Sequence, residues 1–221
     1  MKFNAVLFDL DGTLLDTLSD TGSAMNRALA TLGFDPLPLE EYRYRIGWGA
    51  RVLAQNSLPA ETHNDELITR CIGEFEREYR AQPATVTVPY DGVPELLDEL
   101  ALREIPFSII SNKPDALTRL VVRKLLGKYR FSFVQGDRAE VPRKPDPTTA
   151  LQAAARMNAE PQNILFLGDS DVDMTTARAA AMFPVGAGWG FRSEAELRAA
   201  GAQAVIARPL ELLSFIHPAE R

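Results

Sequence analysis

The sequence predicts an α/β fold, a doubly wound parallel sheet with a helical domain inserted after the first strand. Short, nearly continuous apolar runs alternate with helical patterns over most of the 221 residues, which is typical of a parallel sheet with helices on both faces. One early interval interrupts this alternation. A hydrophobic content of 46% supplies a substantial core at this length. We therefore expect a Rossmann-like unit that carries one helical insertion.

The elements follow in order from a first strand expected at Ala5–Phe8. Further strands are expected at Phe107–Ile110, Phe131–Gln135, Ile164–Leu167, Phe183–Val185 and Ala204–Ile206. Helices are expected at Val93–Arg103, Asp115–Leu126, Pro147–Met157 and Asp171–Ala181. Asp146 followed by Pro147 is a natural helix start, and Gly33 and Gly127 fall where the preceding helices should end.

The long interval after the first strand contains no convincing strand up to about Thr87. Its apolar residues recur at helical spacing. They are Leu29, Leu32, Val52, Leu53, Leu67, Ile68, Ile72 and Phe75. We therefore expect an α-helical cap at 16–85, and a core formed by 1–15 together with 86–221.

Composition narrows the possible partners. A formal net charge of -6 and a pI near 5.1 argue against nucleic acid or an anionic membrane as the main partner. The single cysteine, Cys71, cannot form an internal disulfide, which fits a reducing compartment. The apolar run near the N-terminus is too short for a signal peptide or a membrane span. We expect a cytoplasmic protein, either a monomer or a homodimer.

The motif Asp9-Leu10-Asp11-Gly12-Thr13 follows the first apolar run directly. Carboxylates at the end of a core strand are costly unless they are paired, hydrogen-bonded or bound to a cation. A simpler interpretation is a strand-ending turn in which Asp11 or Asp16 caps the next helix. Three further polar clusters favour a functional site.

Ser111-Asn112-Lys113 follows another expected strand. A hydroxyl, an amide and backbone N–H groups at such a junction can hold a phosphate or a carboxylate, although helix capping by Ser111 or Asn112 is an alternative. The third cluster places Lys144 among prolines that restrain its backbone. Such a lysine is suited to a fixed position beside an anion, whereas most single lysines are simply solvated.

The fourth cluster is Gly168-Asp169-Ser170-Asp171-Val172-Asp173, again after an apolar run. Asp173 lies one helical turn after Asp169, on the same face. Two unit charges about 4 Å apart repel by roughly 4 kcal/mol at an effective dielectric of 20. A hard divalent cation with oxygen ligands removes this repulsion, and Mg²⁺ beside a phosphate is the common arrangement. Because ligands bind at the carboxyl ends of parallel strands, one sheet edge would gather all four clusters.

Taken in order, these clusters resemble the four motifs of the haloacid dehalogenase-like phosphohydrolases. The resemblance covers nearly the whole chain, including the helical cap. Within that superfamily the chain is most similar to the phosphoglycolate phosphatase group. Three segments carry this finer likeness, namely Ile46 to Leu53, Ser111 to Pro114, and Gly188-Trp189-Gly190-Phe191. Trp48 departs from the group's pattern, in which a small polar residue is expected.

The resemblance implies a phosphatase that uses Mg²⁺ and hydrolyses a small phosphate monoester, 2-phosphoglycolate first among them. It implies that Asp9 is the nucleophile that forms an aspartyl-phosphate, and that Asp11 is the general acid and base. Lys144 would offset negative charge and bind phosphate. Ser111 and Asn112 would bind the transferring phosphoryl group.

The implied metal ligands are the Asp9 carboxylate, the Asp11 backbone carbonyl and Asp169, with Asp173 acting on Asp169 or on a bound water. The cap would close over the substrate and select it. The candidate selecting residues are Arg45, Gly47, Trp48, Gly49 and Arg51. The two arginines are candidates for a substrate carboxylate, although cap arginines are more often surface residues.

Several alternatives stay open. The substrate could be a sugar phosphate, a nucleotide or pyrophosphate. A sugar phosphomutase would carry a histidine shortly after the first motif, and Asp16 to Thr21 contains none. A phosphonate hydrolase would need a cap lysine, and no lysine lies between Lys2 and Lys113. A dehalogenase would lack the second aspartate. A phospho-acceptor receiver module is the non-enzyme alternative, but it has no helical insertion.

Overall fold

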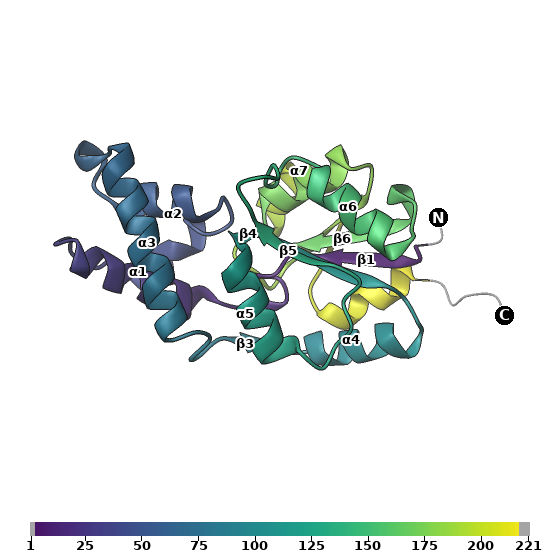
Figure 1. Cartoon of the computed structure of the whole chain (residues 1–221). Coiled ribbons are helices and arrows are strands. Elements are labelled where there is room, and N and C mark those ends of the chain that lie inside the picture. The colour runs from purple at the N-terminus through teal and green to yellow at the C-terminus, as the bar shows by residue number, and fades with distance from the viewer. Residues whose placement is uncertain (1–2, 217–221) are drawn as a thin grey trace.

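The computed structural model describes residues 3–216. Its centre is a six-stranded parallel sheet with the order β5-β4-β1-β6-β7-β8 (Figure 1). The strands are β1 (Ala5–Phe8), β4 (Phe107–Pro114), β5 (Val134–Asp137), β6 (Ile164–Gly168), β7 (Phe183–Ala187) and β8 (Ala204–Ile206). Within β1, Val6 pairs with Phe107 of β4 on one side and with Leu165 of β6 on the other. The predicted parallel α/β sheet is confirmed.

Helices cover both faces of this sheet. They are α4 (Val93–Leu102), α5 (Asp115–Leu126), α6 (Thr148–Met157), α7 (Asp171–Ala179) and α8 (Glu194–Ala199). Side chains alternate across a strand, so Val6 and Phe8 join the apolar cluster under α4 and α5, whereas Ala5 and Leu7 join the cluster under α6 and α7. Figure 1 shows these two helix pairs on opposite sides of the sheet. Burial on both faces explains why β1 is apolar at every position.

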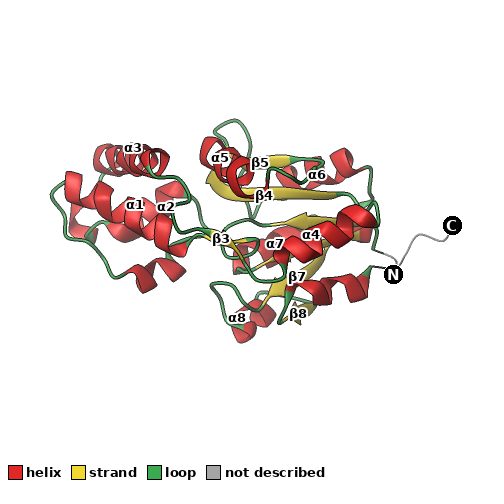
Figure 2. Ribbon diagram, turned by 90° about the horizontal axis from the view of Figure 1, so that it is seen from below, coloured by secondary structure: helices red, strands yellow, loops and turns green. Residues whose placement is uncertain are grey.

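The insertion after β1 is helical, as the fold class predicts. It contains α1 (Leu18–Thr31), α2 (Ala50–Ser57) and α3 (Asp65–Ala81), together with 3-10 helices at Leu39–Tyr44 and Ala60–Thr62. Figure 2 shows these helices gathered to one side of the sheet. Its two connections to the core pair as a short antiparallel ribbon, β2 (Leu15–Asp16) with β3 (Val88–Pro89). Strands of two residues are too short to show the alternation of apolar and polar residues, so they were not predicted from the sequence.

Element ends differ by a few residues from the expected ones. Strand β5 begins three residues after Phe131, the expected start, and β4 continues through the second polar cluster to Pro114. Pro147 is the residue before α6 rather than its first residue, and Asp146 accepts a hydrogen bond from the Thr148 N–H at 2.8 Å. Gly127 ends α5 as expected.

The structure also shows the environments of Gly33 and Cys71. Gly33 follows the end of α1 with a positive φ of 85°, a conformation that glycine adopts without the steric cost of a side chain. Cys71 is buried in the insertion, with its Sγ 3.6 Å from the Met25 Sδ, so it packs as a small apolar residue. None of the helices within residues 3–216 is long and apolar enough to cross a membrane.

Candidate active site

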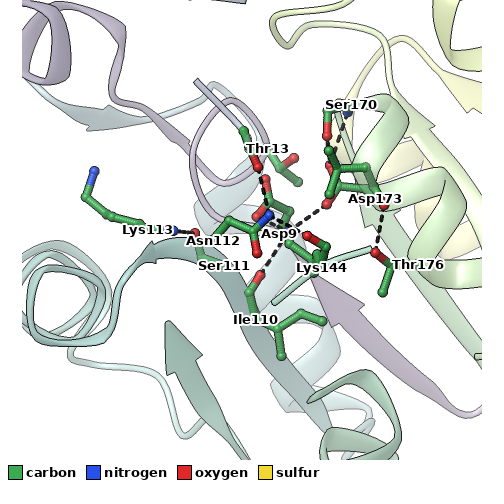
Figure 3. A network of polar contacts seen from close by, with 12 residues as sticks. Asp9, Thr13, Ile110, Ser111, Asn112, Lys113, Lys144, Ser170, Asp173 and Thr176 are labelled. Atoms are coloured by element: carbon green, nitrogen blue, oxygen red, sulfur yellow. Dashed lines mark hydrogen bonds and ion pairs between the residues drawn. The ribbon is translucent and has the colours of Figure 1, made fainter. Parts of the chain in front are cut away.

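The four polar clusters meet at one edge of the sheet. The first, second and fourth follow β1, β4 and β6, which are neighbours in the sheet. The third lies in the loop between β5 and α6, next to β4. Because all these strands are parallel, their carboxyl ends open at the same edge. Figure 3 shows Asp9, Ser111, Lys144 and Asp173 converging from separate elements.

Lys144 connects three of these elements. Its Nζ lies 2.7 Å from Asp9 Oδ1 and 2.7 Å from Asp173 Oδ1, and it donates to the Ile110 carbonyl at 3.4 Å. The side chain is only 4% exposed. Burial by itself would lower the pKa of Lys144, but Asp173 and Asp9 outweigh it and raise the pKa above its usual value. The ammonium is therefore a permanent positive charge at the centre of the site.

Three buried carboxylates lie close together, and two of them pair with this charge. Asp9, Asp169 and Asp173 each offer an oxygen atom, and these atoms lie within 4.8 Å of one another. Burial and the neighbouring Asp173 raise the pKa of Asp9 well above its usual value, and the same two causes raise the pKa of Asp169 to about 7. Crowded acids of this kind favour a bound cation or a proton. The donor set, oxygen atoms only, fits a hard divalent cation such as Mg²⁺.

Asp169 and Asp173 are held by local structure. The Thr13 hydroxyl donates to Asp169 Oδ1 at 3.2 Å, and the Phe191 N–H donates to Asp169 Oδ2 at 2.8 Å. Asp173 Oδ2 accepts from the backbone N–H and the hydroxyl of Ser170, which forms a capping box at the start of α7. The other oxygen of Asp173 is paired with Lys144. Asp173 thus has both oxygens engaged by the protein.

Two glycines allow the first and fourth clusters to approach each other. Gly12 has a φ of +87°, and a Cβ placed on it would lie 2.3 Å from Asp169 Oδ2. A Cβ on Gly190 would lie 2.2 Å from the Asp169 Cβ. No larger residue fits either position without moving Asp169. Both glycines belong to segments that the sequence analysis singled out.

The second cluster joins the core to the insertion. Asn112 Nδ2 donates to the Gly47 carbonyl and to the Lys144 carbonyl, each at 2.9 Å. Ser111 Oγ accepts from the Lys113 N–H at 3.1 Å. Asn112 therefore connects the glycine loop of the insertion to the lysine loop of the core.

Lys113 belongs to the second cluster but had no predicted role of its own, and the fold places it within the site. Its Nζ is 3.0 Å from Asp11 Oδ1 and 4.3 Å from the centre of the Tyr79 ring. The side chain is 3% exposed. Burial would lower the pKa of Lys113, but Asp11 outweighs this effect and raises it. Its place in the second motif was the available signal, while its contact with Tyr79 of α3 appears only in the folded chain.

A residue that the sequence analysis did not name is Arg192, which follows β7. Its guanidinium donates to the backbone carbonyl of Arg43 and, at 3.3 Å, to that of Ile46. It also lies 5.0 Å from the centre of the Tyr44 ring. Arg192 is thus a second contact, besides Asn112, between the core and the loop before α2.

The clusters and the insertion line a pocket that is open to solvent, with about 470 Å³ of empty space including its open mouth. Its core side includes Asp9, Asp11, Ser111, Asn112, Lys113, Lys144 and Ser170. Its insertion side includes Thr21, Ile46, Gly47, Gly49, Ala50, Leu53 and Phe75. The two expected glycines therefore line the pocket.

Three other candidate selecting residues lie outside this lining. Arg45 donates to the carbonyls of Glu41 and Asn56, each at 2.9 Å. Arg51 pairs with Asp65 at the surface, and Trp48 is 38% exposed. The fold thus turns both arginines toward partners within the insertion.

Comparison with known proteins agrees with this geometry. Residues 6–187 match the family model described as haloacid dehalogenase-like hydrolase. Phosphoglycolate phosphatase of Xylella fastidiosa is 37% identical over 85% of this chain and 81% of its own length. That of Xanthomonas campestris pv. campestris is 34% identical, over 87% of this chain and 86% of its own.

A crystal structure from Lactobacillus delbrueckii subsp. bulgaricus, described as a candidate phosphoglycolate phosphatase, superposes with a TM-score of 0.90 at 26% identity. The superposition covers 98% of this chain and 99% of the other. The sheet order, the helical insertion and the four clusters at one sheet edge agree with these matches. The chain therefore belongs to the haloacid dehalogenase-like hydrolases, in their phosphoglycolate phosphatase-like group, and is a phosphoric monoester hydrolase.

Proposed function

We propose that this enzyme is a Mg²⁺-dependent phosphatase that hydrolyses a small phosphate monoester, 2-phosphoglycolate, through an aspartyl-phosphate on Asp9. One observation carries the proposal. Asp9 and Asp11 line a pocket whose other polar groups include Ser111 and Lys144, which suit a phosphoryl group. The substrate assignment is supported by the relatives that are named phosphoglycolate phosphatase.

The reaction divides between the two carboxylates of the first motif. An Asp9 oxygen attacks phosphorus, and the ester oxygen leaves as an alcohol after it takes a proton from Asp11. Water then attacks the phosphoryl group on Asp9 and gives its proton to Asp11. Inorganic phosphate departs, and both carboxyl groups return to their starting states. Covalent catalysis of this kind replaces one difficult displacement with two easier ones.

Positive charge must offset the repulsion between a carboxylate and a phosphate dianion. Lys144, held between Asp9 and Asp173, supplies one such charge at the attacking atom. Bound Mg²⁺ would supply further charge to the phosphoryl oxygens. The Asp9 carboxylate, the Asp11 carbonyl and Asp169 would hold the ion. Asp173 would act from outside the inner ligand set, since its oxygens already accept from Lys144 and Ser170.

The helical insertion would act as the cap, with a boundary near residues 16 and 85. Its residues form one wall of the pocket, and Asn112 and Arg192 of the core bond to the carbonyls of Gly47 and Ile46. These contacts would hold the cap closed over a bound ester. A closed, water-poor pocket strengthens the electrostatic interactions within it.

The test is phosphate release from a panel of esters, with and without Mg²⁺. The panel comprises 2-phosphoglycolate, a hexose phosphate, a nucleoside monophosphate and pyrophosphate. We expect the highest kcat/KM for 2-phosphoglycolate, and loss of activity when a chelator removes the metal. A higher kcat/KM for another member would overturn the substrate assignment. No turnover of any member with Mg²⁺ present would overturn the proposed reaction.

A further inference from the structure

We propose that Lys113 binds a negatively charged group on the alcohol part of the substrate and thereby selects acidic phosphate esters over neutral ones. This inference rests on the proposed phosphatase function and deepens it. It gives the task of substrate selection to a residue of the core motif rather than to the arginines of the insertion.

The charges that line the pocket support this assignment. Within the part of the chain that the structure describes, the cations of the lining are Lys113 and Lys144. Lys144 is held by Asp9 and Asp173, where the phosphoryl group reacts. Lys113 is therefore the pocket cation that remains for the other end of the substrate.

Lys113 also lies at the right place along the substrate. A leaving oxygen that takes a proton from Asp11 must come within about 3 Å of that carboxyl. The Lys113 ammonium lies 3.0 Å from Asp11 Oδ1. Lys113 is thus within about 6 Å of the leaving oxygen, the sum of two such hydrogen-bond distances. An acidic group one or two carbons along the alcohol spans this interval.

The ammonium has capacity for a further partner. An ammonium carries three donors, and within residues 3–216 the hydrogen-bond acceptor of Lys113 Nζ is Asp11. The Tyr79 ring of α3 lies against it at 4.3 Å, a cation–π distance. Donors of this ammonium, which lines the pocket, therefore remain for a ligand.

The rest of the insertion wall offers no charged side chain at the pocket, and its one side-chain hydroxyl among the described residues is that of Thr21. Its side chains at the pocket are mostly apolar, including Ile46, Leu53 and Phe75. A carboxylate beside Lys113 gains a charge-assisted hydrogen bond in a poorly solvated place, which is among the stronger polar contacts. A neutral hydroxyl in the same place gains less. The Lys113 ammonium on the core side, facing a mostly apolar insertion wall, therefore favours an acidic group over a neutral one.

The experiment compares two esters that differ at the relevant group. These are 2-phosphoglycolate and its neutral counterpart 2-hydroxyethyl phosphate, each assayed with saturating Mg²⁺. For the unaltered enzyme we expect kcat/KM to favour the acidic ester about 100-fold, the scale of a buried hydrogen-bonded charge pair. Lys113→Met should reduce this preference to within about threefold, because the ammonium is gone while the side chain length is kept.

Two further variants complete the design. Lys113→Arg keeps the charge and should keep most of the preference, even if its overall rate falls. Lys128→Met removes a lysine whose side chain is 64% exposed and pairs with Asp98 at the surface, so it should leave both esters unchanged. Circular dichroism melting of each variant checks that it folds. The preference of the unaltered enzyme for the acidic ester is tested without any variant.

The possible outcomes separate the two ideas. Equal losses for both esters in Lys113→Met would mean that the lysine only orients Asp11, and would overturn the inference. A lack of preference in the unaltered enzyme would overturn it as well, while leaving the phosphatase function intact. If the unaltered enzyme hydrolyses neither ester in the presence of Mg²⁺, it is the proposed function that fails.

Discussion

The sheet edge lines the pocket with two carboxylates and two ammonium groups, whereas the helical insertion lines it mainly with apolar side chains and glycine backbone. The charged groups on the sheet side are buried and bonded to one another, so their positions are constrained from several directions. The insertion contacts this side of the pocket at two points: the Gly47 carbonyl accepts from the Asn112 amide, and the Tyr79 ring lies against Lys113. In the proposed mechanism the sheet would perform the reaction, while the insertion would exclude water and limit what can enter. Substitutions on the two sides should therefore differ in kind.

The largest effect is expected for Asp9→Asn. The amide keeps the shape of the side chain but cannot attack phosphorus, so kcat should fall by about 10⁴-fold or more, as for other lost nucleophiles. The fold should persist, because the variant removes one of several crowded acids. Phosphate release and circular dichroism measure the two effects. Asp171→Asn, a change close by but outside the pocket lining, is the control; a near-normal rate in Asp9→Asn would refute the nucleophile.

Lys144→Met should damage both activity and folding. It leaves Asp9 and Asp173 buried without their shared cation, and removal of one partner from a buried ion pair costs about 3–5 kcal/mol. Urea unfolding without added metal measures this loss. Removing the exposed Lys128 instead should change the unfolding free energy by less than about 0.5 kcal/mol. If Lys144→Met unfolds at the same urea concentration as the unaltered protein, the ion pairs of Lys144 with Asp9 and Asp173 do not stabilise the fold.

The pH dependence of the unfolding free energy should differ between Asp20 of the insertion and the acids of the site. Burial alone would raise the pKa of Asp20, but hydrogen bonds from Thr87 and Val86 outweigh it and lower the pKa below 3.8. The folded state therefore gains stability from ionised Asp20 above about pH 4, and loses it as the pH falls through the lowered pKa. Asp20→Asn should cost about 1–2 kcal/mol at pH 7, and less at pH 3.

Chemical unfolding at both pH values measures that difference. For the site acids, stability changes with pH in the opposite direction. The pKa of Asp169 is raised to about 7, so the metal-free fold becomes less stable as the pH rises from about 4 to 7. An Asp20→Asn penalty that grows as the pH falls would contradict the hydrogen-bond account of Asp20.

The smallest effect is expected for Arg51→Ala. Arg51 pairs with Asp65, whose side chain is 90% exposed, and surface ion pairs contribute about 0–1 kcal/mol. The KM for 2-phosphoglycolate should change by less than about twofold, since a side chain outside the pocket contributes little to binding. Steady-state kinetics of Arg51→Ala and Lys113→Met, measured in parallel, compare the effects of the two residues on KM. A large rise in KM for the acidic ester alone would show that Arg51 of the insertion, rather than Lys113, binds the substrate carboxylate.

Local patterns in the sequence were sufficient for most of the core. Strand β1 is apolar at every position because both of its faces are covered, and the alternation of strands with helices then predicts a parallel sheet. Once the sheet is parallel, polar clusters after neighbouring strands must lie near one another. This is why the meeting of Asp9, Lys144 and Asp169 could be expected without a structure.

The insertion was predictable only in outline. Its helical spacing indicated helices, but the pairing of β2 with β3 depends on two segments more than 70 residues apart, each too short to show a pattern. The directions of Arg45 and Arg51 depend on how the helices pack. Proximity in sequence to the glycine loop suggested that they face the substrate, and the fold turns both toward partners within the insertion.

By itself, the sequence determined which residue types stand at the carboxyl ends of the strands, because strand periodicity and chain order are local properties. Only the tertiary structure decided what faces those residues across the pocket. Lys113 acquires its place between Asp11 and Tyr79 when α3 of the insertion packs over the sheet edge. The physical reason is that a buried cation is defined by the groups that surround it, and here these groups come from segments that meet only when the chain has folded.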